Sequence, residues 1–544
     1  MSISQSVATI LQEKVTLDIE RIDRMYLNVY MPLLQTPAGV AHFFRTHRGA
    51  AFASSALMEP LTTAFVAALE RYARIQGVPL LTFAKGQRKD DVAAEYRAQF
   101  PGTEGVLFIG KAQEKATVCR TEKRRNPETG HLYPWLVKTT ALVNPYYIYA
   151  VDADFGPFFL KFCSYFPYNA KLCLNGHEDL KRQLDKDGIA YEALDNGLRS
   201  CADPTRAQAI CDGLDAARID ALLHKWLERL PHPFTAADHA AGYRYDLSIL
   251  QAEFARTQVL ACPRTGRLLC EEISEEIIRE NLDLGRPDHV QLIFDRRVTK
   301  RTPGRFRTRV ITHGVTPSLY VDYKKTRSKQ YHKEGRALRT ETTINDTRDV
   351  AIGKRLRHLP ALRAVGFAAT RRLLDVQTLS HDCQIGEEAF QQVTQPQVVA
   401  GQRVSALPFA DPRTQALLSV LVLYGLLPQG FANKDVRERR ALLQGRDPRT
   451  MTPGQMTYDL RRLRLHGLIA RIPHTHRYRV TDEGLRTALF FTRVYARILR
   501  PGLARLAPAP RLATRRHGDT ALRPYFDKLE VAIDRWIDQA KLVA

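Results

Sequence analysis

The N-terminal part of the chain alternates between helical and strand-like spacing of its apolar residues. Residues 55–76 (SALMEPLTTAFVAALERYARIQ) have helical periodicity and are followed by Gly77 and the apolar run VPLLTF, which predicts a helix that leads into a strand. Residues 90–100 predict a charged helix, residues 105–110 (GVLFIG) predict a buried strand, and residues 115–131 predict a basic loop. This alternation predicts an α/β domain with a mixed sheet.

Acidic residues stand at the ends of the next predicted elements. Three successive strands are predicted by the segments YYIYAVDAD, PFFLKFCSY and AKLCLNG. A predicted helix and the predicted strand IAYEALD follow them. Asp152 and Asp154 end the first strand, Glu178 opens the helix, and Asp195 ends the last strand. This order resembles the ribonuclease-H-like nuclease fold, which implies two Mg²⁺ or Mn²⁺ ions about 4 Å apart, with Asp152 and Glu178 among their ligands. In the alternative interpretation these acids are ordinary turn and helix-start residues.

A second set of candidate catalytic residues competes for the same domain. Asp90 or Asp91 precedes Gln113 and Lys115, which stand at the end of the text GVLFIGKAQEK. An acid followed by a strand with Gln-x-Lys resembles the restriction-endonuclease-like nuclease core. The resemblance implies that Asp91 holds a metal ion and that Lys115 polarises the attacked phosphate. The alternative is that these residues form solvated ion pairs.

The pattern changes several times after residue 203, and each change predicts a further domain. The predicted units are an N-terminal α/β domain (1–203), a helical connector (204–285), a basic β-rich domain (286–400), a C-terminal module (401–500), and a basic linker with a last helix (501–544). A chain of 544 residues is too long for one core, which also favours several domains. The expected fold class is therefore α/β multidomain.

Composition argues against several classes of protein. No segment approaches the roughly 18 apolar residues that span a bilayer, and the N-terminus lacks the cationic start of a signal peptide. We therefore expect a protein of the cytoplasm or the nucleoid, without a membrane partner. The eight cysteines show no C-x-x-C or paired Cys/His spacing, which argues against structural zinc. The absence of a Walker or dinucleotide glycine motif argues against ATP-driven chemistry.

Charge gives the clearest indication of the partner. The chain has a formal net charge of +23, and residues 296–339 contribute +12 of it, with fourteen Lys or Arg against two acids. These cations stand in strand-like text among aromatic residues, which predicts rows of positive charge beside rings on a sheet. We therefore expect this segment to bind nucleic acid, and the alternative is a basic sheet rim that balances acidic neighbours. The predicted contact residues are Arg296, Arg297, Arg305, Arg307, Arg309, Tyr320, Lys324, Lys325, Arg327, Lys329, Tyr331, Lys333, Arg336 and Arg339.

Two short texts within this basic segment resemble strands of some phage and plasmid replication initiators. They are YHK at 331–333 and LRTE at 338–341. The resemblance implies Tyr331 as a DNA-nicking nucleophile, although no paired His-x-His metal motif accompanies these two segments. The simpler interpretation is that Tyr331 stacks on a base while the neighbouring cations hold phosphates.

Residues 411–500 predict three helices, a β-hairpin and a final helix. Thr452 as N-cap and Pro453 at the first helical position predict the start of the third helix. Its predicted inward stripe is Met456, Leu460, Leu463 and Leu468. The order of elements resembles winged-helix DNA-binding modules, which implies that the third helix enters a major groove and that the hairpin approaches phosphates. The residues so implied are Gln455, Tyr458, Arg461 and Arg462 on the helix and Arg471, His474, Arg477 and Arg479 on the hairpin. The alternative is a protein–protein adaptor.

These patterns together predict a nucleic-acid-binding protein, with metal-dependent cleavage of DNA or RNA as one hypothesis. The other hypothesis is a binder without catalysis or cofactor, such as a replication initiator or a scaffold for a structured RNA. Stacking rings and phosphate-binding cations serve DNA and RNA alike, so the sequence leaves that choice open. Outside the C-terminal module the sequence resembles bacterial proteins of unassigned function, which implies nothing about mechanism.

Overall fold

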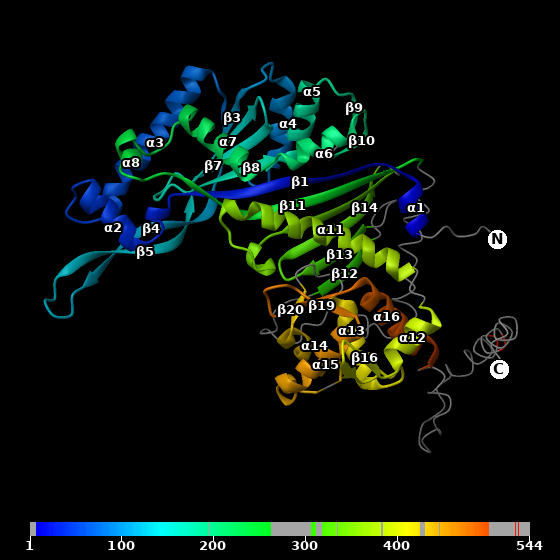
Figure 1. Ribbon diagram of the computed structural model, residues 1–544. Helices are drawn as coiled ribbons and strands as arrows, with labels where there is room; N and C mark the ends of the chain where they lie inside the picture. The colour runs from blue at the N-terminus through cyan, green and yellow to red at the C-terminus, as the bar shows by residue number, and fades with distance from the viewer. Residues whose placement is uncertain are drawn as a thin grey trace, which may run out of the picture. The chain divides into compact units, whose positions relative to one another are not determined.

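The computed structural model has an α/β architecture with several domains built around a large mixed sheet (Figure 1). It describes residues 7–194, 196–262, 306–311, 318–333, 336–381, 385–424, 430–444, 446–499, 528 and 531. Within these residues no helix has the length and apolar character needed to cross a membrane.

Eleven strands form the main sheet. In the order in which they lie across it, they are β12 (Phe306–Ile311), β13 (Ser318–Tyr323), β14 (Thr326–Lys333), β15 (Ala337–Ile344), β11 (Asp246–Leu260), β1 (Val15–Tyr30), β8 (Ala170–Asn175), β7 (Gly156–Phe162), β6 (Tyr146–Asp152), β3 (Gly105–Lys111) and β2 (Leu80–Thr82). Neighbouring strands are antiparallel except β2 and β3, which are parallel. The mixed sheet was therefore predicted correctly.

Two long strands join parts of the chain that the sequence pattern separates. β1 pairs along its length with β11, and β11 pairs on its other side with β15. The helical connector expected at 204–285 is therefore wrong in part, because residues 246–260 form the strand β11. The apolar residues of β11 alternate because one face of the strand packs on a layer of helices. The local strand or helix propensity of residues 246–260 cannot show that they join the main sheet, because their partner strand β1 lies more than 200 residues earlier in the chain. The N-terminal α/β part and the basic β-rich part share one sheet.

Helices cover both faces of this sheet. They are α1 (Val7–Glu13), α2 (Pro37–His42), α3 (Ser55–Gln76), α4 (Lys89–Gln99), α5 (Gly176–Lys186), α6 (Pro204–Asp212), α7 (Ala216–Arg229), α8 (Ala236–Ala240) and α11 (Leu359–His381). The next helix, α12 (Glu387–Thr394), packs instead in the core of the C-terminal module. Shorter 3-10 or π turns are η1 (Pro32–Leu34), η2 (Phe43–His47), η3 (Thr347–Val350), η4 (Leu356–His358), η5 (Pro448–Thr450) and η6 (Tyr495–Leu499). The helix predicted at 55–76 is confirmed with the same bounds as α3, and Gly77 ends it in the left-handed conformation with φ of 64°.

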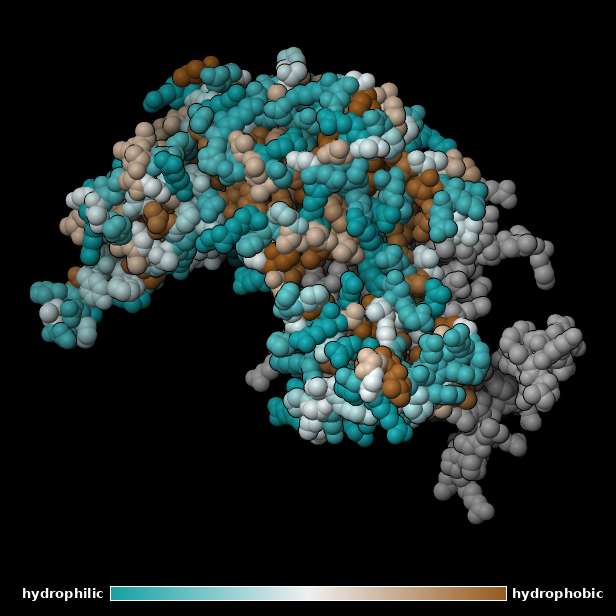
Figure 2. Space-filling view, viewed as in Figure 1, coloured by the Kyte–Doolittle hydropathy of each residue, from teal (hydrophilic) through white to brown (hydrophobic). Residues whose placement is uncertain are grey.

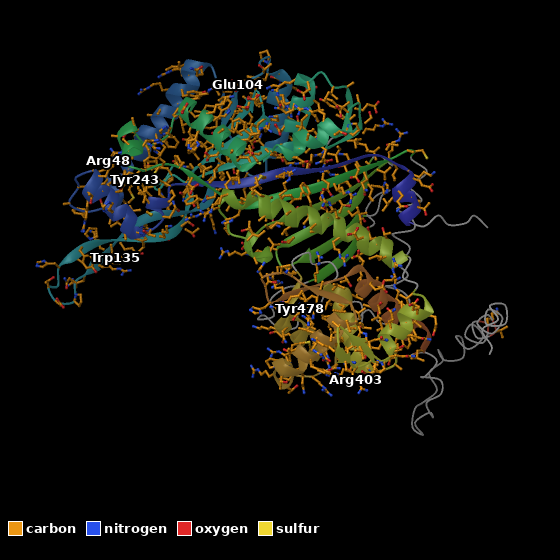
Figure 3. The ribbon with its side chains drawn as sticks, in the orientation of Figure 1. Arg48, Glu104, Trp135, Tyr243, Arg403 and Tyr478 are labelled. Atoms are coloured by element: carbon orange, nitrogen blue, oxygen red, sulfur yellow. The ribbon has the colours of Figure 1, made fainter. Side chains whose placement is uncertain are left out.

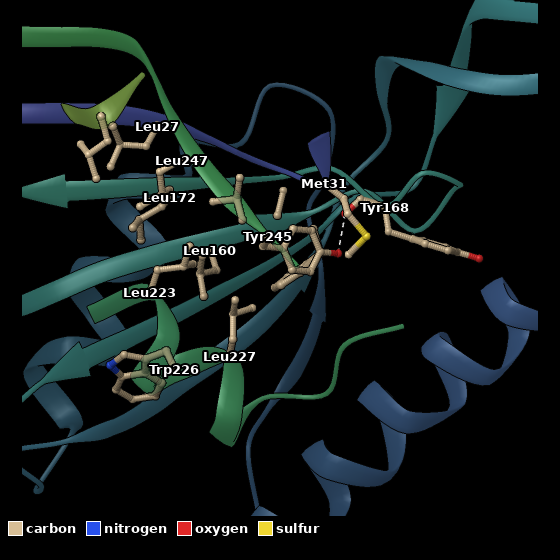
Figure 4. Packing of buried hydrophobic residues seen from close by; sticks show 14 of the residues in the cluster. Leu27, Met31, Leu160, Tyr168, Leu172, Leu223, Trp226, Leu227, Tyr245 and Leu247 are labelled. Carbon is tan, nitrogen blue, oxygen red and sulfur yellow. Dashed lines mark hydrogen bonds between the residues drawn. The ribbon is translucent and has the colours of Figure 1, made fainter. Parts of the chain in front are cut away.

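The largest core cluster lies on one face of the sheet, beneath α3, α7 and α11 (Figure 4). In β6, Ile148 points into this cluster, while its neighbours Tyr147 and Tyr149 point to the opposite face beside α4. Trp226 of α7 is buried among these apolar side chains, and the hydroxyl of Tyr245 donates a 2.9 Å hydrogen bond to the Tyr168 carbonyl (Figure 4). Because both faces of β6 are buried, its sequence is a nearly continuous run of apolar and aromatic residues.

Four smaller sheets complete the described structure. A two-stranded ribbon of β4 (Glu114–Arg125) and β5 (Leu132–Val143) extends away from the main sheet (Figure 1). This ribbon replaces the basic loop expected at 115–131. The other small sheets are β9 (Tyr191–Leu194) with β10 (Gly197–Cys201), β16 (Gln397–Val399) with β17 (Gln402–Val404), and β18 (Phe431–Ala432) with β20 (Arg477–Val480) and β19 (Ile469–Arg471).

The C-terminal module has a core of its own. Its helices are α13 (Pro412–Tyr424), α14 (Asn433–Leu443), α15 (Pro453–Leu465) and α16 (Asp482–Val494). The predicted helix start at Pro453 is confirmed, and the predicted inward stripe of the third helix is buried. A Cβ at Gly430, whose φ is 62°, would lie 1.9 Å from the Tyr478 carbonyl oxygen, so the close pairing of β18 with β20 requires glycine there.

Candidate nucleic-acid interface

Asp152 lies in a buried polar network rather than in an open metal site. Its Oδ1 accepts hydrogen bonds from the backbone N–H groups of Asp154 and Phe155, at 2.8 and 3.1 Å, which closes the turn after β6. Its Oδ2 accepts bonds from Lys225 Nζ at 2.7 Å and Trp226 Nε1 at 2.8 Å. Burial alone would raise the pKa of Asp152, but the hydrogen bonds hold it at about 2. Both oxygens already accept two bonds each, so this carboxylate does not fit a divalent ion.

The other acids of the ribonuclease-H-like set are not assembled around a common point. Glu178 at the start of α5 accepts hydrogen bonds from Arg97 and Lys181, and although burial alone would raise its pKa, these cations hold it at about 2. Asp154 is exposed and pairs with a lysine of α5. Asp195 lies outside the described residues, and the strand before it, β9, pairs with β10 and not with β6. Among the described residues, these acids do not form a group with metal-ligand spacing.

The second predicted set is dispersed on the surface. Asp91 is exposed in the first turn of α4, where it lies 3.7 Å from Arg88. Gln113 and Lys115 are also exposed, because β3 ends at Lys111 and the two residues belong to the start of the ribbon. The expected continuous strand through Lys115 is therefore wrong, and no shared site forms from these three residues.

Glu114 lies between Gln113 and Lys115 in the chain. Unlike theirs, its side chain points toward the protein and makes several contacts there. Its carboxylate accepts hydrogen bonds from Lys89 Nζ at 2.6 Å, from Lys161 Nζ, and from the Tyr147 hydroxyl at 2.5 Å. Burial alone would raise the pKa of Glu114, but these donors hold it at about 2. Strand alternation places Glu114 on the opposite face from its neighbours, and recognising β4 in the sequence would have indicated this.

The basic segment of the sequence is described only in part. Arg296, Arg297 and Arg305 lie outside the described residues, and so do the side chains of Arg307, Arg309 and Tyr320. The described members that are exposed are Lys324, Lys325 and Arg327. Lys329, Tyr331, Lys333 and Arg336 are half-buried, and Arg339 is fully buried. The prediction that Arg339 contacts phosphate is therefore wrong, because its guanidinium lies within the protein.

Arg339 belongs to a group of charged residues on the face of β1, β11, β14 and β15, here named the central cluster. Its members are Arg21, Asp23, Glu253, Tyr331, Arg339 and Glu341. The Tyr331 hydroxyl donates a 2.7 Å hydrogen bond to Glu341, and Lys329 Nζ lies 4.1 Å from the centre of the Tyr331 ring. The structure thus places Tyr331 in a structural contact, which disfavours both base stacking and nicking by this residue. Sequence reasoning missed Asp23 and Glu253 because their partners are distant in the chain.

The acids of the central cluster are balanced by arginines. The carboxylate oxygens of Asp23, Glu253 and Glu341 lie within 4.8 Å of one another. Arg339 pairs with Asp23 and with Glu341, and Arg21 Nε lies 2.6 Å from Asp23. Burial and the nearby Glu341 carboxylate raise the pKa of Glu253, which favours its neutral form. Two arginines thus pair with two of the three acids, and the expectation of Mg²⁺ or Mn²⁺ stays a prediction.

The third helix of the C-terminal module, α15, is capped and packed as the sequence predicts. The Thr452 hydroxyl accepts a 3.3 Å hydrogen bond from the Gln455 backbone N–H. On the buried side, Asp459 pairs with Arg413, Arg440 and Arg462. Arg462 also donates to the carbonyls of residues 405 and 406. Arg462 is therefore not on the exposed side from which a base edge could be read, because the helix repeat turns it toward Asp459.

Other predicted residues of this module do face solvent. Gln455 and Tyr458 are exposed on α15, with 47% of Tyr458 accessible. Arg461 is half-buried and donates to Gln402, while Arg464 is exposed, as expected for the outward face of this helix. Arg471, His474 and Arg479 are exposed on the hairpin of β19 and β20, and Arg477 is half-buried and donates to the Gly430 carbonyl. Figure 3 labels Tyr478 on the same hairpin. A helix and an adjoining hairpin thus carry exposed cations.

The β4–β5 ribbon is a second surface with cations and rings, and sequence reasoning missed it. Trp135 of β5 is 44% exposed (Figure 3), and Tyr133 of the same strand is 38% exposed. The Arg124 guanidinium lies 4.9 Å from the Trp135 ring centre. The turn sequence NPETG lies between two runs that contain Thr and Val, the second of which also contains Tyr133 and Trp135, and this was the available signal for a hairpin.

Comparison of the chain with protein-family models, curated proteins and solved structures finds no match. The functional assignment therefore depends on the chemistry of the surfaces themselves. Two of these surfaces expose cationic side chains beside aromatic ones. One is α15 with the adjoining β19–β20 hairpin, and the other is the β4–β5 ribbon.

Proposed function

We propose that the protein binds nucleic acid through its C-terminal module, acting as a winged-helix type of reader. The observation that carries this proposal is the order helix, strand, helix, helix, strand, strand from α13 to β20, with β20 between β18 and β19 in the sheet. This order leaves α15 exposed on one side and sets a hairpin with Arg471 and Arg479 beside it. A helix with a basic hairpin is suited to contact a groove and the adjoining phosphates.

The formal net charge of +23 supports a polyanionic partner. Within the module, exposed cations at Arg464, Arg471 and Arg479 accompany the polar Gln455 and Tyr458. Cations that meet phosphates position a duplex, whereas side chains such as Gln455 discriminate between base edges. We do not extend the proposal to phosphodiester cleavage, because the predicted carboxylates are held in ion pairs or dispersed on the surface.

The test uses the full chain and a duplex DNA of 30 base pairs. Arg471→Glu with Arg479→Glu is expected to weaken binding at least tenfold and to reduce the slope of log affinity against log salt by about 2, since each phosphate contact contributes about 0.9. The matched control is Arg71→Glu with Arg74→Glu, an equal charge change on the exposed end of α3. Equal losses in both variants would mean that net charge, and not the module, determines binding.

A further inference from the structure

The outer part of the β4–β5 ribbon has no packing role within the described protein. At its base, Cys119 and Leu136 belong to the largest core cluster, and Thr121 exchanges hydrogen bonds of 2.7 and 3.0 Å with Ser55 at the start of α3. Beyond this anchor, residues 122–125 and 132–135 are exposed on both faces of the ribbon. We name residues 122–135 the ribbon tip. Figure 1 shows it extending clear of the main sheet.

The ribbon tip is an ordered structure rather than an irregular loop. β4 and β5 pair without a register shift from Glu114 opposite Val143 to Arg125 opposite Leu132. Twelve residues per strand correspond to a ribbon about 40 Å long at a rise of roughly 3.3 Å per residue. In the turn, the Asn126 N–H donates to the His131 carbonyl at 2.9 Å, and the Asn126 side chain accepts from the Glu128 N–H at 2.9 Å. The hairpin therefore keeps a defined end although its tip packs against no core residue.

Each face of the ribbon tip combines cations with apolar groups. Cross-strand pairing puts Arg124 opposite Tyr133 on one face and Arg125 opposite Leu132 on the other. Leu132 is 61% exposed, and within the described residues Lys123 and Arg125 have no ion-pair partner. Figure 2 shows mainly hydrophilic residues at the end of this hairpin, with hydrophobic ones nearer the body. On the face of Leu132, an exposed apolar side chain thus lies beside cations that have no ion-pair partner in the described part of the chain, whereas Arg124 on the other face lies 4.0 Å from the Glu122 carboxylate. The Leu132 face indicates a partner with apolar surface between negative charges.

We propose that the ribbon tip is a second nucleic-acid contact that lies in a groove of duplex DNA. A B-form groove has phosphates along its rims and base edges on its floor, which matches cations beside an exposed leucine and proline at the tip. A two-stranded ribbon fits the B-form major groove, which is about 12 Å wide, whereas the deep, narrow major groove of A-form RNA excludes it. The inference rests on the proposed nucleic-acid function and selects duplex DNA from the classes that function leaves open.

The position of Arg124 favours a groove contact over stacking on a single strand. Proteins that bind single strands present free ring faces on which bases stack. In the ribbon tip, the Arg124 guanidinium already covers one face of Trp135, and the Tyr133 ring meets it edge-on with centroids 6.2 Å apart. One ring face of Trp135 is therefore occupied within the ribbon and is not free for a base. Duplex DNA is the partner that such a charged ribbon recognises.

The experiment measures fluorescence anisotropy of the full chain with duplex DNA, duplex RNA and single-stranded DNA of one sequence. Lys123→Glu with Arg125→Glu is expected to weaken duplex DNA binding at least tenfold and to reduce the salt slope by about 2. Leu132→Ser is expected to weaken binding about threefold to tenfold without changing the slope. Arg71→Glu with Arg74→Glu again controls for net charge. Because the tip packs against no core residue, thermal unfolding of the tip variants should match that of the wild type.

The outcomes separate this inference from the proposed function. Duplex DNA binding that is reduced by the tip variants and not by the α3 control supports the inference. Equal effects of tip and control variants, or tighter binding of duplex RNA or single-stranded DNA than of duplex DNA, would overturn it while the C-terminal module could still bind. A wild-type chain that binds no nucleic acid would overturn both proposals.

Discussion

The Trp226 indole nitrogen donates a 2.8 Å hydrogen bond to the Asp152 carboxylate, and the two residues are 74 positions apart in the chain. This contact joins the end of β6 to α7 and accounts for an acid at a strand end without invoking a metal. Asp152→Ala is expected to destabilise the protein by about 3 kcal/mol, because it leaves Lys225 and the indole without their buried partner. Urea unfolding measures this, with the exposed Asp154→Ala as control. Unchanged stability together with loss of a Mg²⁺-dependent cleavage would return Asp152 to a metal site.

Acid should weaken the protein partly through Glu114. Its pKa in the folded protein is about 2, below the ordinary 4.5, so its ion pairs contribute stability above about pH 4.5 that is lost as the pH falls toward 2. The side chain is 29% exposed, and after allowance for solvent screening the contribution is about 1–2 kcal/mol. Unfolding of the wild type between pH 5 and 2.5 should therefore be more pH-dependent than that of Glu114→Gln. Parallel pH curves for the two proteins would show that Glu114 contributes nothing.

Arg462 should affect stability and not DNA discrimination. Arg462→Ala removes one of three arginines around buried Asp459 and should cost about 2 kcal/mol, measured by chemical denaturation. The control, Arg464→Ala on the exposed side of the same helix, should change stability by less than about 0.5 kcal/mol. If Arg462→Ala folds as stably as the wild type but loses sequence preference, the base-reading role predicted from the sequence is correct.

Tyr331 should likewise behave as a structural residue. Tyr331→Phe removes the hydrogen bond to Glu341 and is expected to cost about 1 kcal/mol of unfolding free energy, with duplex affinity unchanged. Denaturation and anisotropy on the same preparations measure the two quantities. Covalent attachment of nicked DNA to the wild type, absent from Tyr331→Phe, would instead identify a nucleophile.

The basic segment remains a predicted contact surface. Reversing Arg305, Arg307, Lys324 and Lys325 to Glu should lower affinity for nucleic acid and flatten its salt dependence, because each phosphate that a cation neutralises contributes about 0.9 to the slope. Titration of the full chain at several salt concentrations measures this. A quadruple variant with an unchanged slope would exclude these four residues from the interface.

Local chemistry in the sequence was sufficient for several elements. Helix periodicity and Gly77 defined α3, and Thr452 with Pro453 defined the start of α15. The capping signals act within one helical turn and the periodicity lies within the helix itself, so a local window of sequence contains both. By contrast, β1 pairs with residues of β11 more than 200 positions away, and β11 pairs with residues of β15 about 80 to 90 positions away, and no local window contains either pairing.

By itself, then, the sequence determined the α/β class, the helix boundaries set by caps, the apolar stripe of α15 and the strongly basic character. The tertiary structure decided which charges are available to a partner. The sequence predicts Arg339 and Arg462 to be surface cations, but both are buried. Arg339 pairs with Asp23 of another strand, and Arg462 pairs with Asp459 on the buried side of the same helix. Conversely, Trp135 and Leu132 read as ordinary apolar residues but project into solvent. Burial depends on what packs against a residue, and that is decided when distant segments meet.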